Sequence, residues 1–334
     1  MKIMEPKFVD RDAEIAKLLE LSKQSSTLPI YVYGPEGCGK TRLFKEFIGM
    51  FDGVGVYIDA LERSELDRAL FLSPYIKDCS SLIAEILAST TGSIGRILAD
   101  KIASILARIA SRYKLKNSRI VLVVDDIAHA IGVDKVEWYI KWLYELEWKT
   151  IRGHEPEAIV FIATTSEGTS LRKVLRHSYS TVKLIWNLPW NGYYQLALQL
   201  NPPQMDLIRE TWKFTGGNPR KLIELALDYN WNINEWFKKQ ILRLEPLYRE
   251  IKVKGLTNEL NQVIENPDNI YHKASTRMDQ LYHLLLDENL VIYKHMDTLT
   301  NTFIQVDSEL GIGEYYAWQV PVYKLALEEL LKTK

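Results

Sequence analysis

The run Gly34-Pro35-Glu36-Gly37-Cys38-Gly39-Lys40-Thr41 most constrains what this chain can fold into, because it matches the pattern G-x-x-x-x-G-K-[ST] at every fixed position. The apolar residues 30–33 before it are typical of a buried strand, and residues 43–48 after it are typical of the start of a helix. A strand, a glycine-rich turn and a helix in this order predict a loop that binds phosphate groups.

The residue types in this loop explain how it would hold an anion. Glycines adopt backbone angles closed to other residues, so successive amides can turn inward, and the helix start adds unpaired amides and a positive dipole end. We expect Lys40 to reach the β- and γ-phosphates of a nucleoside triphosphate, and the Thr41 hydroxyl to ligate Mg2+. The residues expected to contact the nucleotide here are Gly34, Pro35, Glu36, Gly37, Cys38, Gly39, Lys40, Thr41 and Arg42.

Composition excludes several classes of protein. With 334 residues, of which 47% are hydrophobic and 25% charged, the chain is globular and long enough for two or three domains. A net charge of -1 provides no overall field toward nucleic acid or anionic lipid. Two cysteines do not make a disulfide framework, which favours a cytoplasmic location. No apolar stretch is long enough for a membrane span, so no membrane partner is expected.

The order of strand-like and helical segments predicts three domains. Apolar segments at 30–33, 54–58, 120–124, 159–163 and 182–186 alternate with helical stretches. This alternation predicts an α/β P-loop NTPase core with a five-stranded parallel sheet over residues 1–186. Residues 187–244 have a helical pattern and no strand pattern, which predicts a helical lid domain.

The last region, residues 245–334, begins helical and then becomes strand-like. Helices are predicted at 256–264 and 275–287, strands at 290–293, 302–306 and 315–320, and a closing helix at 323–331. Helices followed by a small β-hairpin predict a winged helix-turn-helix domain.

A long insertion at 61–119 is helical in pattern, with Ile94, Leu98, Ile102, Ile105 and Ile109 on one face. Its other face is basic: seven Lys or Arg residues and one acid lie between positions 96 and 119. Such a face is typical of a solvated helix, and it is also the best place in this chain for a phosphate backbone or another anionic partner.

Two carboxylates follow the predicted strand at 120–124, which is the Walker B arrangement. We expect Asp125 to hold the magnesium ion and Asp126 to orient the water that attacks the phosphate. The strand at 159–163 ends in Thr164-Thr165-Ser166, on the sheet edge where Asp125 is expected. We expect one of these hydroxyls, assigned to Thr165, to polarise the water or contact the γ-phosphate.

Together with the run Thr215-Gly216-Gly217-Asn218-Pro219-Arg220, these motifs resemble the archaeal branch of the AAA+-related STAND-class P-loop ATPases. The resemblance extends over most of the chain. It implies that residues 8–14 form the family's N-terminal box, so that Val9 and Arg11 lie near the adenine. It also implies that Pro219 lies near the base and that Arg220 contacts the γ-phosphate.

The resemblance further implies an enzyme that hydrolyses ATP to ADP and phosphate with Asp126 as the water-activating acid. Many relatives carry Glu at this position, so the shorter Asp implies slow turnover. In such proteins the nucleotide sets the position of the C-terminal domain. The implied function is a Mg2+-dependent, nucleotide-controlled conformational switch with a protein partner or self-assembly.

Two other functions remain open from the sequence. A nucleic-acid-associated ATPase in replication, repair or transcription would bind DNA through the C-terminal domain, but residues 245–334 carry nine Lys and Arg against fourteen Asp and Glu. A small-molecule kinase also carries a phosphate loop, but the second Walker B acid and the long C-terminal half argue against it. DNA is therefore possible but disfavoured as a partner.

Overall fold

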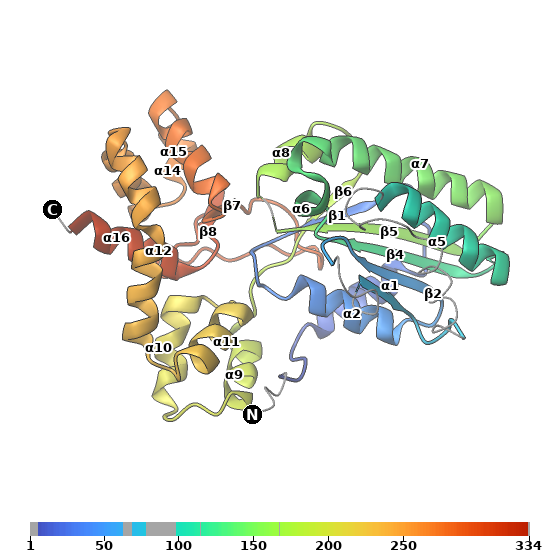
Figure 1. The fold of residues 1–334 in the computed structure, drawn as a ribbon, viewed down its shortest axis with the longest axis horizontal. Coiled ribbons are helices and arrows are strands. Elements are labelled where there is room, and N and C mark those ends of the chain that lie inside the picture. The colour runs from blue at the N-terminus through green and yellow to red at the C-terminus, as the bar shows by residue number, and fades with distance from the viewer. Residues whose placement is uncertain (1–5, 63–68, 78–97, 114, 167, 333–334) are drawn as a thin grey trace. The chain divides into compact units, whose positions relative to one another are not determined.

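The computed structural model describes residues 6–62, 69–77, 98–113, 115–166 and 168–332 (Figure 1). The chain divides into two compact units. The first, here called the sheet unit, consists of Arg11–Tyr33 and Lys40–Leu184. The second, the helical unit, consists of Met1–Asp10, Gly34–Gly39 and Ile185–Lys334. Most of the glycine-rich loop therefore groups with the C-terminal half of the chain.

A six-stranded sheet forms the centre of the sheet unit. Its strands are β1 (Ile30–Tyr33), β2 (Val54–Asp59), β3 (Leu70–Leu72), β4 (Arg119–Asp125), β5 (Ala158–Thr165) and β6 (Thr181–Leu184). Their order is β3-β2-β4-β5-β1-β6, and every pairing is parallel except that between β2 and β3. The expected α/β core with a mostly parallel sheet is confirmed.

The expected number of five strands is wrong, because β3 adds a sixth at one edge. It pairs antiparallel with β2, where Tyr57 lies opposite Phe71. Leu70 and Leu72 are buried, whereas Phe71 is exposed. Three residues with this alternation give too short a pattern to distinguish from the helical stretch predicted around them.

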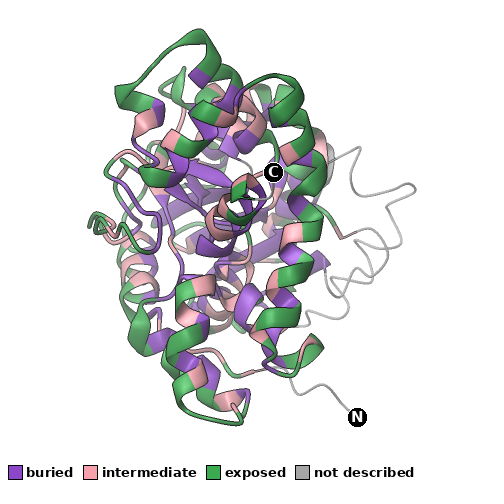
Figure 2. Cartoon of the chain, turned by 90° about the vertical axis from the view of Figure 1, so that its left-hand side faces the viewer, coloured by how far each residue is buried: buried purple, intermediate pink, exposed green. Residues whose placement is uncertain are grey.

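Apolar side chains explain why the central strands form. All residues of β1 and β5 are buried, and Figure 2 draws the central strands of the sheet in the buried colour. A parallel sheet needs helices on both faces to achieve this. The helices are α1 (Asp12–Leu21), α2 (Lys40–Met50), α5 (Leu98–Arg112), α6 (Ile127–Ile131), α7 (Val136–His154) and α8 (Gly168–Leu175), with a short 3-10 helix at Val133–Lys135. In Figure 1, α7 and α8 lie above the sheet and α2 lies below it.

The predicted helical insertion is confirmed where α5 is described. Ile102, Ile105 and Ile109 are buried, as their helical spacing predicts. Ile94, Arg96 and Lys114 lie outside the described residues.

One hydrophobic core runs through the helical unit, from Leu188 to Leu330. Its helices are α9 (Trp190–Gln199), α10 (Asp206–Thr215), α11 (Pro219–Asp228), α12 (Ile233–Val253), α13 (Thr257–Glu265), α14 (Asn269–His272), α15 (Thr276–Asp287) and α16 (Pro321–Lys332). The last helix, α16, packs against α10, α12 and α13. Helix α12 runs through residues 244 and 245, where the sequence divides the lid from the C-terminal domain. Within the described ranges, no helix is long and apolar enough to cross a membrane.

Two of the three C-terminal strands predicted from the sequence are present. They are β7 (Val291–Tyr293) and β8 (Tyr316–Trp318), which pair antiparallel. Residues 302–306 do not form a strand. The Thr302 amide donates instead to the Thr298 hydroxyl (3.0 Å), and the Lys294 ammonium donates to the Ile304 carbonyl (2.7 Å). Side chains thus occupy backbone groups of this segment that a strand would use to pair with a neighbouring strand.

Candidate functional site

The loop between β1 and α2 has the backbone of a phosphate cradle. Gly37 and Gly39 adopt positive φ angles of 76° and 98°. A Cβ atom built on Gly39 would meet nothing within 4 Å, so the loop has open space at that point. Helix α2 begins at Lys40, which is buried, and its first amides follow the loop directly. Open space beside a helix N-terminus and a lysine fits a bound phosphate group.

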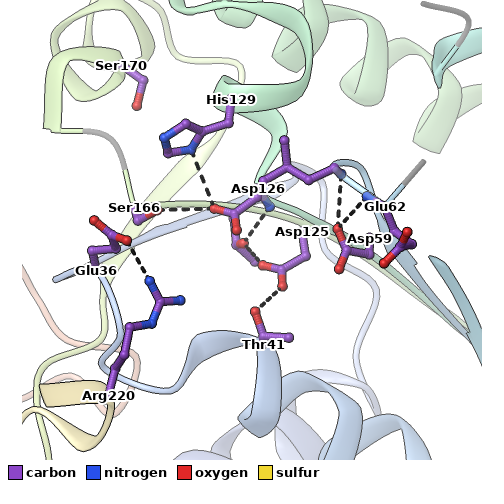
Figure 3. A network of polar contacts seen from close by, with 12 residues as sticks. Glu36, Thr41, Asp59, Glu62, Asp125, Asp126, His129, Ser166, Ser170 and Arg220 are labelled. Carbon is purple, nitrogen blue, oxygen red and sulfur yellow. Dashed lines mark hydrogen bonds and ion pairs between the residues drawn. The ribbon is translucent and has the colours of Figure 1, made fainter. Parts of the chain in front are cut away.

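The Asp125 carboxylate lies at the end of β4, is 1% exposed and accepts three hydroxyl hydrogen bonds. Thr41 donates to Oδ2 at 2.5 Å, Tyr57 donates to the same oxygen at 2.6 Å, and Thr164 donates to Oδ1. The Thr41 hydroxyl and the Asp125 carboxylate are hard oxygen donors, the kind that Mg2+ prefers. Figure 3 shows them joined at the start of α2, so this pair fits a magnesium ion.

Tyr57 is a site residue that the sequence analysis missed. Burial, and then the charge of Asp125, raise the pKa of its hydroxyl well above the usual range for tyrosine. The hydroxyl therefore stays protonated and remains a donor to Asp125. No local sequence pattern marks Tyr57. It comes near Asp125 through the pairing of β2 with β4, in which Tyr57 lies opposite Val123.

Asp126 follows β4 in a left-handed backbone conformation, with φ at 53° and ψ at 42°. Its amide donates to the Thr164 hydroxyl (3.2 Å), and its Oδ1 accepts from Ser166 (3.2 Å) and lies 3.9 Å from His129 Nδ1. Burial and the neighbouring Asp125 charge raise the pKa of the Asp126 carboxyl, against opposing effects of Lys40, His129 and Ser166. A carboxylate with a raised pKa is a better proton acceptor, which fits the role predicted for Asp126.

The hydroxyls after β5 divide between the two carboxylates. Thr164 bridges them, because it donates to Asp125 and accepts from the Asp126 amide. Of the two carboxylates, Ser166 donates to that of Asp126. Thr165, the residue assigned from the sequence, is fully buried between them and lies opposite Tyr33 in the sheet, so its catalytic role stays a prediction.

A second polar group lies in the helical unit and holds the outer part of the loop. Arg220 Nη1 lies 2.5 Å from Glu36 Oε1, and the two side chains are 62% and 47% exposed. Asn218 caps α11 by accepting from the Lys221 amide (3.1 Å), and its Nδ2 donates to the Glu36 carbonyl (2.8 Å). Figure 3 shows the Glu36–Arg220 ion pair.

Gln319 connects this group to the C-terminal end of the helical unit. Its Oε1 accepts from the Glu36 amide at 2.9 Å, and its Nε2 donates to Asn289 Oδ1 at 2.6 Å. Its carbonyl accepts from Asn187 Nδ2 at 2.9 Å. Gln319 lies 283 residues from Glu36 in sequence, and no local pattern identifies it.

The other residues predicted to contact the nucleotide lie as follows. Val9 is partly buried against the core of the helical unit, and Pro219 is the first residue of α11. Arg11 is buried and pairs with Glu14 (2.6 Å). Arg42 pairs with Glu46 within α2 (2.8 Å). Nucleotide contacts of these four residues stay predictions.

Comparisons with known proteins give a matching family, a relative and a solved structure. Residues 8–225 match the family described as an ATPase domain predominantly from Archaea. The chain is also 26% identical over 260 residues to a protein of Pyrococcus horikoshii named an uncharacterized ATP-binding protein, covering 70% of this chain and 78% of that protein. Among solved structures, domain III of the replication initiation protein DnaA from Thermotoga maritima matches with a TM-score of 0.34 and 15% identity. That match covers 65% of this chain and 86% of the DnaA chain.

Proposed function

The chain belongs to this family of ATPase domains, found predominantly in Archaea, and from that premise we propose that it is a slowly hydrolysing, nucleotide-controlled conformational switch. The relative named as an ATP-binding protein supports adenine nucleotide as its ligand. Membership in the AAA+-related STAND class is part of the proposal. It is supported by the combination of the phosphate loop, the two Walker B acids and the Asn218-Pro219-Arg220 helix start.

The residues of the site support a division of chemical roles. The loop amides and Lys40 would bind the phosphates, and Thr41 with Asp125 would hold Mg2+. The ion would neutralise charge that develops on the phosphates. Asp126 would accept a hydrogen bond from the attacking water, with Ser166 and His129 fixing the orientation of its carboxylate.

The observation that carries the switch proposal is the Glu36–Arg220 ion pair. Glu36 belongs to the phosphate loop, and Arg220 stands at the first turn of α11. Because a γ-phosphate carries more negative charge than a carboxylate, ATP in the loop would compete with Glu36 for the guanidinium. ADP lacks that group, so the two nucleotides would favour different positions of Arg220.

Gln319 would transmit the change at Glu36 and Arg220 to the C-terminal residues. It binds the Glu36 amide and Asn289, which precedes β7. We include in the proposal the three domains 1–186, 187–244 and 245–334, with a winged helix in the last. The winged helix is supported by α13 to α15 followed by the β7–β8 pair.

Affinities for ATP and ADP test the competition directly. In Glu36→Gln the rival carboxylate is gone, so we expect ATP to bind about fivefold more tightly with little change for ADP. In Arg220→Ala we expect ATP to bind about fivefold more weakly, again with little change for ADP. Glu259→Gln removes a glutamate–arginine pair away from the phosphate loop, that with Arg277, and serves as the control. Calorimetric titrations that show both variants changing ATP affinity in the same direction would contradict the proposal.

A further inference from the structure

Four aromatic rings form a row near the β7–β8 pair of the helical unit. The rings of Tyr271 and Tyr315 stack with centroids 4.3 Å apart and planes at 14°. His295 stacks on Tyr315 at 4.9 Å and 27°, and Phe303 lies 6.2 Å from His295. The end rings, Tyr271 and Phe303, are 57% and 58% exposed. We call these four residues the aromatic row.

Buried polar contacts hold the aromatic row in place. The Asp268 carboxylate is 6% exposed and accepts the amides of Glu314 (2.6 Å), Tyr315 (2.8 Å) and Tyr316 (2.9 Å). The Lys294 amide donates to the Tyr315 carbonyl at 2.8 Å. The backbone that carries Tyr315 is thus fixed, so stacking of a ligand on this ring would cost little conformational entropy.

Acidic residues outnumber basic ones in the segment that carries the aromatic row. Between positions 266 and 320 the acids are Asp268, Asp279, Asp287, Glu288, Asp297, Asp307, Glu309 and Glu314. The only cations in that range are Lys273, Arg277 and Lys294. Arg277 pairs with Glu259 at 2.7 Å, and Lys294 is buried with its ammonium on the Ile304 carbonyl. Glu314 is exposed beside the ring, and its charge, ahead of burial, raises the pKa of the Tyr315 hydroxyl.

We propose that the aromatic row and Glu314 form a docking surface for an arginine-bearing segment of a partner protein. A guanidinium stacks on the face of a tyrosine and pairs with a carboxylate at the same time. Exposed, rigid aromatic rings next to acids offer both contacts, with charge complementary to a cationic peptide.

The same charge argues against a single-stranded nucleic acid on this surface. Aromatic rings alone stack with bases as well as with guanidinium groups. Platforms that bind single strands, however, combine such rings with a positively charged groove, whereas this segment has more acids than cations and places Glu314 beside Tyr315. Because the rings alone could stack with bases, binding of an oligonucleotide is the main competing outcome of the test.

Fluorescence anisotropy with the full-length chain tests the proposal. The probe is a labelled nine-residue peptide of alternating Arg and Gly, compared with the same peptide carrying neutral citrulline and with a labelled 12-mer of dT. We expect the Arg peptide to bind and the citrulline peptide to bind at least about fivefold more weakly. Absent binding of the Arg peptide at submillimolar protein, or tighter binding of the dT 12-mer, would overturn the proposal.

Matched variants separate this surface from general attraction to an acidic chain. Tyr271→Ala should weaken the Arg peptide about fivefold, whereas Tyr271→Phe keeps the ring and should retain binding. Trp138→Ala removes an equally exposed ring of the sheet unit (58%) and should change nothing. Glu314→Gln should weaken binding more than Glu288→Gln, which removes an exposed acid at the end of α15. Equal affinities for wild type and Tyr271→Ala, with unchanged thermal unfolding, would refute the site.

Discussion

The two polar groups that border the phosphate loop differ in burial and in how firmly their partners are fixed. Around Asp125, three hydroxyls converge on one carboxylate that is almost fully buried. At Glu36, a single arginine pairs with a carboxylate, and both side chains are largely exposed. Replacing a partner in the first group leaves a buried charge with one donor fewer, whereas water can replace either partner in the second.

In the proposed function, the buried group around Asp125 would bind the metal and orient water, and the exposed Glu36–Arg220 pair would respond to the bound nucleotide. A buried, fully hydrogen-bonded carboxylate keeps its geometry, as metal binding and water orientation require. An exposed ion pair contributes little to stability, so a bound phosphate can exchange it at low cost. The account therefore predicts large functional losses in the buried group and small stability effects in the exposed one.

Lys40→Ala should have the largest effect, because it removes the ammonium that we propose to bind two phosphate groups. We expect ATP affinity to fall about 1000-fold, from the loss of two charge-assisted hydrogen bonds. Titration calorimetry measures it, with Lys17→Ala on α1, which removes a lysine paired with Glu20, as control. Retained ATP affinity would contradict the assignment of the loop.

Asp126→Asn should separate binding from hydrolysis. The amide keeps the size of the side chain but cannot accept a proton, so turnover should fall about 100-fold with ATP affinity retained. Phosphate release under single-turnover conditions measures the rate. Asp134→Asn, which alters an exposed aspartate paired with Lys173, should leave it unchanged. Unchanged turnover in Asp126→Asn would place the water-orienting group elsewhere.

Stability should also depend on pH through Glu147, a buried carboxyl on α7 in the sheet unit. Burial raises its pKa from 4.5 to about 8. The folded state thus holds a proton that the unfolded state releases, so stability is complete below the unfolded pKa and is lost as pH rises toward 8.

Glu147→Gln does not titrate and should remove this loss. We expect the free energy of unfolding of the variant to gain about 3 kcal/mol over that of wild type between pH 5 and pH 8. Urea unfolding at the two pH values measures the difference. Glu36→Gln alters an exposed glutamate and should show no such pH-dependent gain. A constant difference between wild type and Glu147→Gln at both pH values would contradict the raised pKa.

Tyr57→Phe and Arg220→Ala, which each remove one contact, should give the smallest of these effects. Tyr57→Phe removes one of three donors to Asp125 and should cost about 1 kcal/mol in the free energy of unfolding. Arg220→Ala, in the exposed pair, should cost less than about 0.5 kcal/mol. If Arg220→Ala proves the more destabilising variant, the contrast between the two groups is wrong.

The sequence predicted those site residues that belong to short contiguous patterns. The phosphate loop is contiguous, and Asp125 is marked by the apolar strand that ends in it. The prediction that hydroxyls after the strand at 159–163 lie beside Asp125 needed only the rule that parallel strands end at one edge of a sheet, and Thr164 does donate to Asp125. The five predicted strands of the core are therefore present with small differences at their ends.

Features that depend on distant partners could not be predicted in this way. β3 is three residues long and exists because β2 offers it an edge. The segment 302–306 has strand-forming residues, but the Thr298 hydroxyl and the Lys294 ammonium bind its backbone. Tyr57 and Gln319 reach the site only through the pairing of β2 with β4 and through the fold of the helical unit.

Hydrogen–deuterium exchange with saturating ADP and with a non-hydrolysable ATP analogue tests the central claim most directly. If the γ-phosphate draws Arg220 away from Glu36, amides of residues 217–222 should exchange at different rates with the two nucleotides, because the Arg220 amide donates to the Gly37 carbonyl. Helix α1 should exchange equally with both. Identical exchange across residues 217–222 in the two states would contradict the switch.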